Sequence, residues 1–450
     1  MRRDRTSARN LPVPTVSGRR IPEHPGLPTA RELESALRQH VLDAWFPRCL
    51  DVEHGGFLCD FDRAWRPLGP HDKLLEFQAR QTLLAAEAFR AFPHDQDLRA
   101  AALHGLRCLR GPLWDRDSGG WFHRLDRAGR PLEAETKHAH GAAYAIEACV
   151  AVHEATGEPG ALDLAREGFE WLEQHSHDRE HGGYFGFLKR DGTVITDPVQ
   201  CPWKTAVDSI GTEIGLKDAN VHSDLLETLV YLYRAWPDPT VRERLIEVLD
   251  LLCDRMTVAS TGALHIFATP DWAPVPHLVR SGYQCQGAFR FALARGVVGD
   301  EARLRRLAIR LLDHALRYTL DPRSGGFFYA SPGAAPMEFE NHSLVVSWKT
   351  WWIQVEALKA LLEISTLAPE NPTYLDHFAA QWRYIERNLL DQRYGGFYFR
   401  GLDTVRRRRR VLGPGFAPPG VTRKGDVWKD ASHDGRALLH CLSALGGPGR

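Results

Sequence analysis

The sequence has no long apolar run and no excess of either charge. Its 57 Lys and Arg are balanced by 57 Asp and Glu, so no net charge attracts nucleic acid or a membrane surface, and we expect neither as a partner. Apolar stretches such as residues 142–152 are far shorter than the roughly 20 residues that cross a bilayer. The basic start of the chain, MRRDRTSARN, is not followed by an apolar segment, so no signal peptide is predicted.

The eight cysteines are scattered and form no CxxC pair. The sequence has no metal-ligand spacing and no nucleotide-binding loop, so we expect neither a metal nor another cofactor. Isolated cysteines in apolar segments are typical of buried, reduced thiols. The expected localisation is therefore cytoplasmic.

One short pattern does recur: an Asp, three further residues, Gly-Gly and then aromatic residues. Five copies begin at Asp51, Asp115, Asp178, Asp321 and Asp391. The intervals between them are 64, 63, 143 and 70 residues, and the long interval leaves room for a sixth copy. We assign that copy to Asp254, which precedes a degenerate segment at 262–267. Six units of similar length indicate a repeat architecture.

Each unit also contains helical stretches, in which apolar residues recur every three or four positions. Examples are residues 74–91, 141–155, 225–235, 303–318 and 351–365. Two helices in each of six units predict an all-α fold, a closed (α/α)6 toroid of six helical hairpins in which the Gly-Gly segments form short β-hairpin insertions. An open solenoid is the alternative, but the unit is too long for a tetratricopeptide array.

The repeat also sets the expected domain boundaries. Residues 25–450 form one toroid domain, and residues 1–24, rich in Arg, Pro and Ser, form a flexible basic tail. The five consecutive arginines at 406–410 are interpreted as a solvated loop in preference to a phosphate or nucleic-acid patch.

Six motifs of polar and aromatic residues accompany the predicted helices. They are KLLEFQAR (73–80), KHAHGAAY (137–144), KDANVHSDLLE (217–227), GYQCQ (282–286), WKTWWIQVE (348–356) and WKDASHDGR (428–436). In the third, Asn220, Asp224 and Glu227 share one helix face, which on an inner helix would face a central pocket. In this order, over residues 30 to 445, the motifs resemble those of the N-acylglucosamine 2-epimerase family, which includes cellobiose 2-epimerases and aldose–ketose isomerases.

The resemblance implies roles for these residues. His433 falls on one of the two catalytic histidines of the family, and Arg80 on the arginine that holds substrate oxygens. Trp351 or Trp352 would stack on the sugar. The other residues that the resemblance and the motifs assign to substrate binding are His140, Asn220, Asp224, Glu227, Gln286, Glu356 and Trp428.

The sequence departs from the family pattern at three of these places. Tyr283 stands where the family has its second catalytic histidine, Gln286 where it has a glutamate, and Asp224 where it has a histidine. Tyr283 is therefore the second catalytic candidate. Tyrosine has an ordinary pKa of about 10, which makes it a poor base, although it can donate a proton or a hydrogen bond.

The family reaction removes the C2 proton of an open-chain aldose and forms an enediolate, and His433 would be the main general acid and base. Inversion at C2 needs acid/base groups on both faces of that intermediate, whereas transfer of the proton to C1 needs one face. We therefore expect aldose–ketose isomerisation of a small-molecule carbohydrate in preference to 2-epimerisation. His140 or His222 could instead supply a second base from another helix.

Two other classes stay open. One is a sugar-binding pseudoenzyme that has lost catalysis. The other is a hydrolase or lyase that uses Asp224 and Glu356 as acid and base. The sequence identifies neither the sugar nor the oligomeric state, and a homodimer is one state compatible with it.

Overall fold

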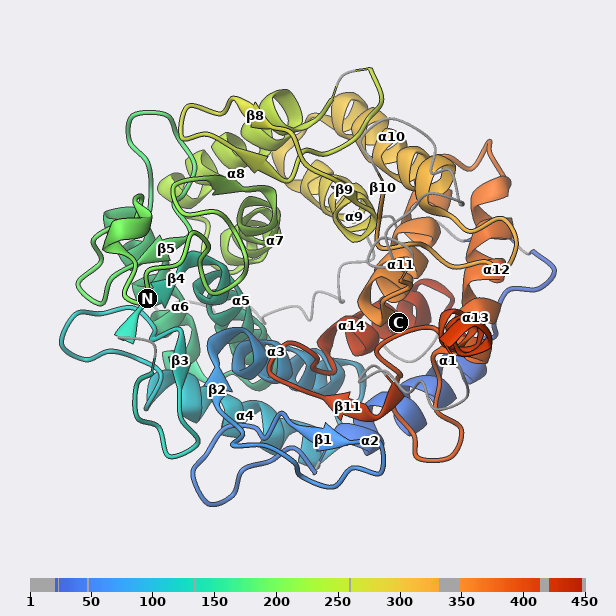
Figure 1. Cartoon of the computed structure of the whole chain (residues 1–450), viewed down its shortest axis with the longest axis horizontal. Coiled ribbons are helices and arrows are strands. Elements are labelled where there is room, and N and C mark those ends of the chain that lie inside the picture. Colours follow the sequence, from blue (N-terminus) through green and yellow to red (C-terminus); the bar gives the residue numbers. More distant parts are fainter. Residues whose placement is uncertain are drawn as a thin grey trace, which may run out of the picture.

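The computed structural model describes residues 21–22, 24–46, 48–132, 135–258, 260–331, 348–412 and 421–446. These residues form a closed ring of helices around a central axis (Figure 1). The predicted (α/α)6 toroid is thus confirmed. Most of the predicted N-terminal tail lies outside the described residues, and a single domain over 25–450 stays a prediction.

Among the described residues, six helices line the inside of the ring and six flank them on the outside. The inner helices are α3 (Leu75–Ala91), α5 (Ala139–Thr156), α7 (Ala219–Ala235), α9 (Ser281–Val298), α11 (Trp351–Leu367) and α14 (Ser432–Ala444). The outer helices are α4 (Gln96–Arg110), α6 (Pro159–His175), α8 (Pro239–Asp250) with η4 (Leu251–Met256), α10 (Glu301–Thr319), α12 (Thr373–Asn388), and α1 (Ala30–Leu37) with η1 (Arg38–Leu42) and α2 (Asp43–Trp45). Helix α14 packs against both α1 and α3, and this contact closes the ring.

Short antiparallel strands join consecutive units at the end of the ring where the inner helices begin. The strands are β1 (Phe61–Asp62), β2 (Lys73–Leu74), β3 (Arg124–Leu125), β4 (Lys137–His138), β5 (Phe187–Leu188), β6 (Lys217–Asp218), β7 (Phe267–Ala268), β8 (Pro274–Val275), β9 (Val279–Arg280), β10 (Ala330–Ser331) and β11 (Arg423–Gly425). They pair as β2–β3, β4–β5, β6–β7–β8, β9–β10 and β1–β11. Apart from the β7–β8 hairpin, each pairing ties the residues before one inner helix to a neighbouring unit, so these strands fix where five of the inner helices start.

The inner helices are buried on almost every side, whereas the outer helices are amphipathic. The burial of the inner helices explains why two of them begin earlier than expected. Helices α5 and α7 begin earlier than the apolar pattern predicts, because their first turns carry polar residues that face the interior. The side chains of His138 and Asp218 cap these two helices by accepting hydrogen bonds from backbone N–H groups.

In five units, the Asp of the repeated pattern forms an ion pair with a buried Lys that lies ahead of the next inner helix. The pairs are Asp51–Lys73 (3.2 Å), Asp115–Lys137 (3.1 Å), Asp178–Lys217 (2.7 Å), Asp321–Lys349 (2.7 Å) and Asp391–Lys424 (2.7 Å). Both glycines of each pattern adopt left-handed backbone angles, for example +74° at Gly55 and +67° at Gly56. Glycine is used here because other residues rarely adopt such angles.

The assignment of the sixth copy to Asp254 is wrong. Val258 occupies the turn position: its N–H donates to the carbonyl of Ala263 at 2.7 Å, and its carbonyl accepts from the N–H of Gly262 at 2.8 Å. Asp51 makes the same pair of bonds in the first unit. Asp254 lies four residues earlier, in η4.

The lysine is missing from this unit as well, because Val279 stands where the other units have the buried lysine. Val258 and Val279 thus replace both partners of the ion pair. Because both partners are replaced, no buried charge is left without a partner. A single unpaired buried charge would destabilise the fold far more than the loss of the whole pair.

Three further expectations can be compared with the structure. The arginines at 406–410 lie in a helix, α13 (Leu402–Leu412), so the expected loop is wrong. All eight cysteines are buried free thiols, as expected. Within the described part of the chain, no helix is both long and apolar enough to cross a membrane.

Candidate active site

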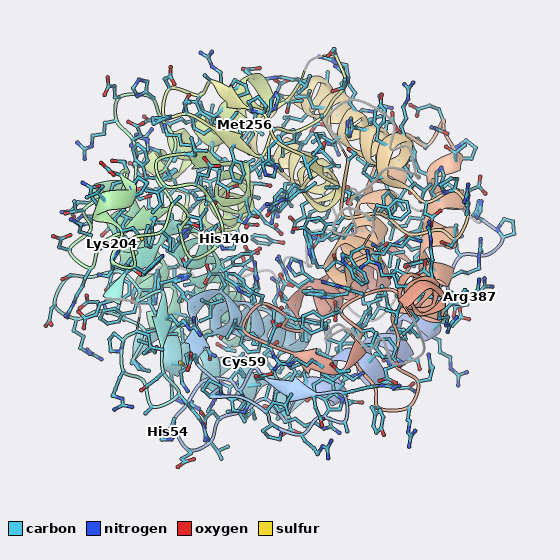
Figure 2. All side chains as sticks on the ribbon, viewed as in Figure 1. His54, Cys59, His140, Lys204, Met256 and Arg387 are labelled. Atoms are coloured by element: carbon cyan, nitrogen blue, oxygen red, sulfur yellow. The ribbon has the colours of Figure 1, made fainter. Side chains whose placement is uncertain are left out.

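A cavity of about 310 Å³ opens where the inner helices begin. Its walls are formed by Arg80, His140, Tyr144, Ile210, Asn220, Arg280, Tyr283, Gln286, Tyr329, Trp351, Trp352, Trp428 and His433. Figure 2 shows side chains projecting into the middle of the ring, with His140 at its inner wall. A larger hollow of about 790 Å³ lies on the outside between α6 and α8, but none of the motif residues proposed for catalysis or binding lines it.

Nine of the twelve predicted site residues line this cavity. They are Arg80, His140, Asn220, Tyr283, Gln286, Trp351, Trp352, Trp428 and His433. The other three, Asp224, Glu227 and Glu356, are buried behind the wall and contact residues that form it or support it. Residues from motifs more than 350 positions apart in the chain therefore meet at one place.

The repeat explains why these positions face inward. In α3, α5, α7, α9 and α11 the sixth residue is Arg80, Tyr144, Asp224, Gln286 and Glu356, respectively. The second residue lies one turn earlier on the same face, and in α5, α7, α11 and α14 it is His140, Asn220, Trp352 and His433. Two turns of each inner helix thus supply most of the cavity wall.

His433 is oriented by a carboxylate. Its Nδ1 lies 2.8 Å from Oε1 of Glu356, whose Oε2 pairs with Lys359 at 2.9 Å. Burial alone would raise the pKa of Glu356, but the charge of Lys359 and the hydrogen bond from His433 outweigh it and hold that pKa below its usual range. An ionised carboxylate can only accept, so Nδ1 of His433 donates the proton, and in the neutral ring Nε2 is the nitrogen that carries the lone pair.

His140 has both ring nitrogens engaged. Nδ1 lies 3.0 Å from Glu76, and Nε2 lies 2.9 Å from Asp224. Burial alone would lower the pKa of His140, but these two carboxylates outweigh it and raise that pKa to about 9. The carboxylates thus favour the imidazolium form, in which neither nitrogen has a lone pair with which to accept a proton.

Tyr283 packs between an arginine and a tryptophan. Nη1 of Arg280 donates to its hydroxyl at 3.3 Å, and the ring of Trp352 lies 5.8 Å away. Burial raises the pKa of Tyr283 above its ordinary value. The side chain thus stays a neutral phenol that can donate a hydrogen bond but is a poor base.

Trp352 approaches α9 closely because Gly282 has no side chain. A Cβ at Gly282 would overlap the indole ring of Trp352. On its other side, the Trp352 ring lies 5.8 Å from the ring of His433. The glycine of the GYQCQ motif therefore sets the position of an aromatic ring beside the candidate base.

Arg80 lies over the ring of Tyr144, with its guanidinium carbon 4.1 Å from the ring centroid. Its Nη1 is 3.7 Å from Asp430. The hydroxyl of Tyr144 in turn donates to Asp224 at 3.0 Å. These contacts fix a guanidinium at the cavity wall, where it can stabilise negative charge on a substrate oxygen.

Behind the wall, acidic and basic side chains form a buried network. Asp224 pairs with Arg290, which also donates to Glu227 at 2.8 Å. Glu227 accepts at 3.0 Å from Arg436. Glu227 therefore supports the wall from behind and is not among the described residues that line the cavity.

His222, considered as a second base, lies outside the cavity. Its Nδ1 is 2.7 Å from the carbonyl of Asp218, and the N–H of Tyr184 donates to its Nε2 at 2.9 Å. Burial lowers the pKa of His222 to about 4. The equivalent residues of three other inner helices, Gln78, Gln284 and Gln354, also bond to the backbone after the turn, so His222 has a structural role.

Four residues of the cavity wall were not among the predicted site residues: Tyr144, Ile210, Arg280 and Tyr329. Tyr144 is the sixth residue of α5, so the repeat register could have identified it. Arg280 is the last residue of strand β9, and Tyr329 directly precedes strand β10, which pairs with β9. Ile210 comes from the long segment between β5 and β6, and nothing in its sequence signals a position at the cavity.

Comparison with known proteins indicates a family for the chain. The model of the N-acylglucosamine 2-epimerase family matches residues 148–207 and 208–415, more than half of the chain. A cellobiose 2-epimerase of Bacteroides fragilis is 24% identical over 417 residues, which are 92% of this chain and 98% of that protein.

Two solved structures share the fold. The cellobiose 2-epimerase of Bacillus thermoamylovorans superposes with a TM-score of 0.79 at 19% identity, over 92% of this chain and 98% of the other. A D-mannose isomerase superposes with a TM-score of 0.75 at 20% identity, over 94% of this chain and all of the other.

Proposed function

Since the chain belongs to the N-acylglucosamine 2-epimerase family, we propose that it interconverts an aldose and its 2-ketose, with His433 as the general base and acid. The observation that carries this proposal is the contrast between two cavity histidines. His433 has one nitrogen bound to Glu356 and makes no hydrogen bond through the other within the described part of the chain, whereas both nitrogens of His140 lie within 3.0 Å of carboxylates.

The proposed reaction starts from the open-chain aldose. Nε2 of His433 takes the proton from C2, the C–H electrons form the C1–C2 double bond, and the carbonyl oxygen O1 becomes anionic. Arg80 stabilises this enediolate oxygen. A proton passes from the hydroxyl at C2 to O1, and His433 returns the proton that it holds to C1, which gives the 2-ketose.

The other cavity residues support this assignment. Trp351 and Trp352 provide aromatic faces for the sugar, and Trp428, Asn220 and Gln286 provide contacts at its edge. Glu356 acts on His433 and not on the sugar. Tyr283 acts as a hydrogen-bond donor, since its raised pKa makes it a poor second base.

These features disfavour 2-epimerisation, which needs an acid/base group on each face of the enediolate. His140 could act there only by releasing a proton, which would leave a neutral ring between two buried carboxylates, Glu76 and Asp224. A single base that moves a proton between neighbouring carbons on one face needs no such step.

The two alternative classes receive less support. A hydrolase built on Asp224 and Glu356 needs a protonated acid near the sugar, but both carboxylates lie behind the wall with their pKa values held low by cations. A non-catalytic sugar-binding protein would have no need of the His433–Glu356 pair in the cavity.

The test is solvent exchange. The protein is incubated in deuterated water with a panel of free and N-acyl aldoses, and the C1 and C2 positions are followed by NMR. A ketose carrying deuterium at C1 supports the proposal. Deuterium at C2 of the epimeric aldose, with no ketose, would establish epimerisation instead, and sugar binding without exchange would establish the non-catalytic alternative.

A further inference from the structure

Arg280 differs from the other buried arginines at the centre of the ring. Arg80, Arg290 and Arg436 each have a carboxylate within 4 Å. Among the described residues, Arg280 has none: its contacts are the hydroxyl of Tyr283 at 3.3 Å and the rings of Tyr283 and Tyr329 at 5.6 and 6.0 Å. Asp218 acts on this guanidinium only from beyond 4 Å, so a half-buried cation with no carboxylate in contact can take one from a ligand.

The cavity around Arg280 is poor in negative charge. Three arginine and histidine side chains line it, namely Arg80, His140 and Arg280, and no Asp or Glu is among the described residues that do so. Behind the wall, Arg80 is paired with Asp430, and His140 lies between Glu76 and Asp224. Of these three basic side chains, Arg280 alone has no carboxylate within 4 Å in the described part of the chain.

The contacts of Arg280 also orient it. The rings of Tyr283 and Tyr329 lie beside the guanidinium, and Nη1 donates to the Tyr283 hydroxyl, which leaves the other N–H groups for a ligand. A guanidinium edge matches the paired oxygens of a carboxylate or a phosphate group. The phenol of Tyr283, which stays protonated, is an additional donor at the same place.

Arg280 is separated from the candidate base by two rings. Trp352 lies 5.8 Å from His433, Tyr283 lies 5.8 Å from Trp352, and Arg280 follows Tyr283. A sugar whose C1 and C2 lie at His433 would therefore extend along these rings toward Arg280, which lines the same cavity.

We propose that Arg280 binds an anionic group, a carboxylate or a phosphate, at the end of the substrate remote from C1 and C2. The preferred substrate is then a sugar acid or a sugar phosphate and not a neutral sugar. This inference rests on the proposed function for the direction in which the sugar lies, but the anion site itself does not depend on catalysis.

The test compares matched sugars on the intact protein. Dissociation constants are measured by calorimetry for mannose, mannuronate and mannose 6-phosphate, and for the corresponding three glucose compounds. The wild type should bind one charged member of a series at least about tenfold more tightly than the neutral one, as expected for a charge-assisted hydrogen bond. Comparison of the affinities for the uronate and for the 6-phosphate shows which anion is recognised.

Two variants test whether Arg280 causes the preference for charged sugars. Arg280→Gln should bind charged and neutral members alike while keeping the affinity for the neutral sugar. Arg280→Lys, which retains the charge without the planar fork, should keep part of the preference and serves if the glutamine variant does not fold. Arg179→Gln, on the outer surface, is the matched control and should behave as the wild type.

The outcomes separate this inference from the proposed function. Equal binding of charged and neutral sugars by the wild type, or a preference that survives Arg280→Gln, overturns the anion site. Solvent exchange measured on the same samples tests catalysis. If the wild type exchanges protons but shows no preference for charged sugars, the anion site is wrong and the proposed function stands. If the wild type prefers charged sugars, Arg280→Gln loses that preference and no sugar exchanges, the proposed function is wrong and the anion site stands.

Discussion

Nδ1 of His433 lies 2.8 Å from Oε1 of Glu356, although the two residues belong to different inner helices and are 77 positions apart. The carboxylate fixes the tautomer and the orientation of the imidazole together, because it can accept only from a protonated Nδ1. The proposed base therefore depends on a partner that never contacts the substrate, and the two residues can be tested separately.

His433→Ala should reduce solvent exchange at C2 by about 10²–10⁴-fold, the usual cost of losing a general base. The fold should be unchanged, since the His433 side chain lines the cavity and is partly exposed. Exchange is measured by NMR and the fold by circular dichroism. Wild-type exchange in His433→Ala would show that another group is the base.

Glu356→Gln tests the positioning role. The amide cannot act as an ionised acceptor, so we expect kcat to fall by about tenfold or more while KM changes little. The Nδ1 proton of His433, followed by NMR in ¹⁵N-histidine-labelled protein, should shift or disappear. A purely structural role of Glu356 would lower stability and leave that proton resonance unchanged.

Tyr283→Phe should cost much less than His433→Ala, because a one-base transfer does not use Tyr283 as a base. The double variant Tyr283→His with Gln286→Glu restores the family residues and should introduce 2-epimer among the products. The products of each variant are identified by chromatography, and the reaction rates are measured on the same samples. If wild-type protein epimerises C2 and Tyr283→Phe abolishes this, Tyr283 is a second acid/base.

His140 should make stability depend on pH. Its pKa is about 9 in the folded protein, against about 6.5 when unfolded, so the folded state binds this proton more tightly. The resulting stabilisation, on the order of 3 kcal/mol, is fully present below pH 6.5 and is lost as the pH rises through 9. The groups that produce it are Glu76 on α3 and Asp224 on α7.

The measurement is chemical denaturation between pH 6 and 10 of the wild type and of His140→Gln. The difference in unfolding free energy between them should shrink as the pH rises, since glutamine does not titrate. A difference that stays constant over this range would mean that His140 is neutral in the folded protein.

Much of this molecule was predictable because its six units repeat. The Asp, Gly-Gly and aromatic pattern predicted the toroid, and the order of the motifs predicted the family and nine residues of the cavity wall. Periodicity and motif order both survive in a sequence that is about one quarter identical to its relatives.

The errors have physical causes. The aspartate of the pattern predicts Asp254 for the turn of the fourth unit, whereas the turn geometry needs the glycine backbone and tolerates Val258 when Val279 replaces the lysine. Arg280 was missed because a single arginine beside a motif carries no periodic signal. Its significance comes from the absence of a carboxylate neighbour among the described residues, which is a tertiary property.

The Asp178–Lys217 pair should show strong thermodynamic coupling. Asp178→Val or Lys217→Val alone leaves a buried charge without its partner and should cost about 3–5 kcal/mol of unfolding free energy. The double variant imitates the fourth unit, with its Val258 and Val279, and should cost less than the two single variants combined. Denaturation of all four proteins gives the coupling energy, and simple additivity would show that the ions act independently.

Two glycines of helix α9 provide a matched pair of substitutions. A Cβ at Gly282 would overlap the ring of Trp352, whereas a Cβ at Gly296 would meet no atom within 4 Å. Gly296→Ala should raise stability by up to about 1 kcal/mol, since alanine favours helix more than glycine. Gly282→Ala must displace Trp352 from its place beside His433 and Tyr283.

We therefore expect Gly282→Ala to weaken sugar binding by roughly tenfold, the loss of one aromatic contact, and to approach the affinity of Trp352→Ala. Calorimetry with the best-bound sugar of the panel measures both variants against Gly296→Ala. Because the two alanine substitutions lie in one helix, a general effect on α9 would appear in both. Wild-type affinity in Gly282→Ala combined with a loss in Trp352→Ala would show that the ring binds sugar equally well from another position, and that Gly282 does not place it.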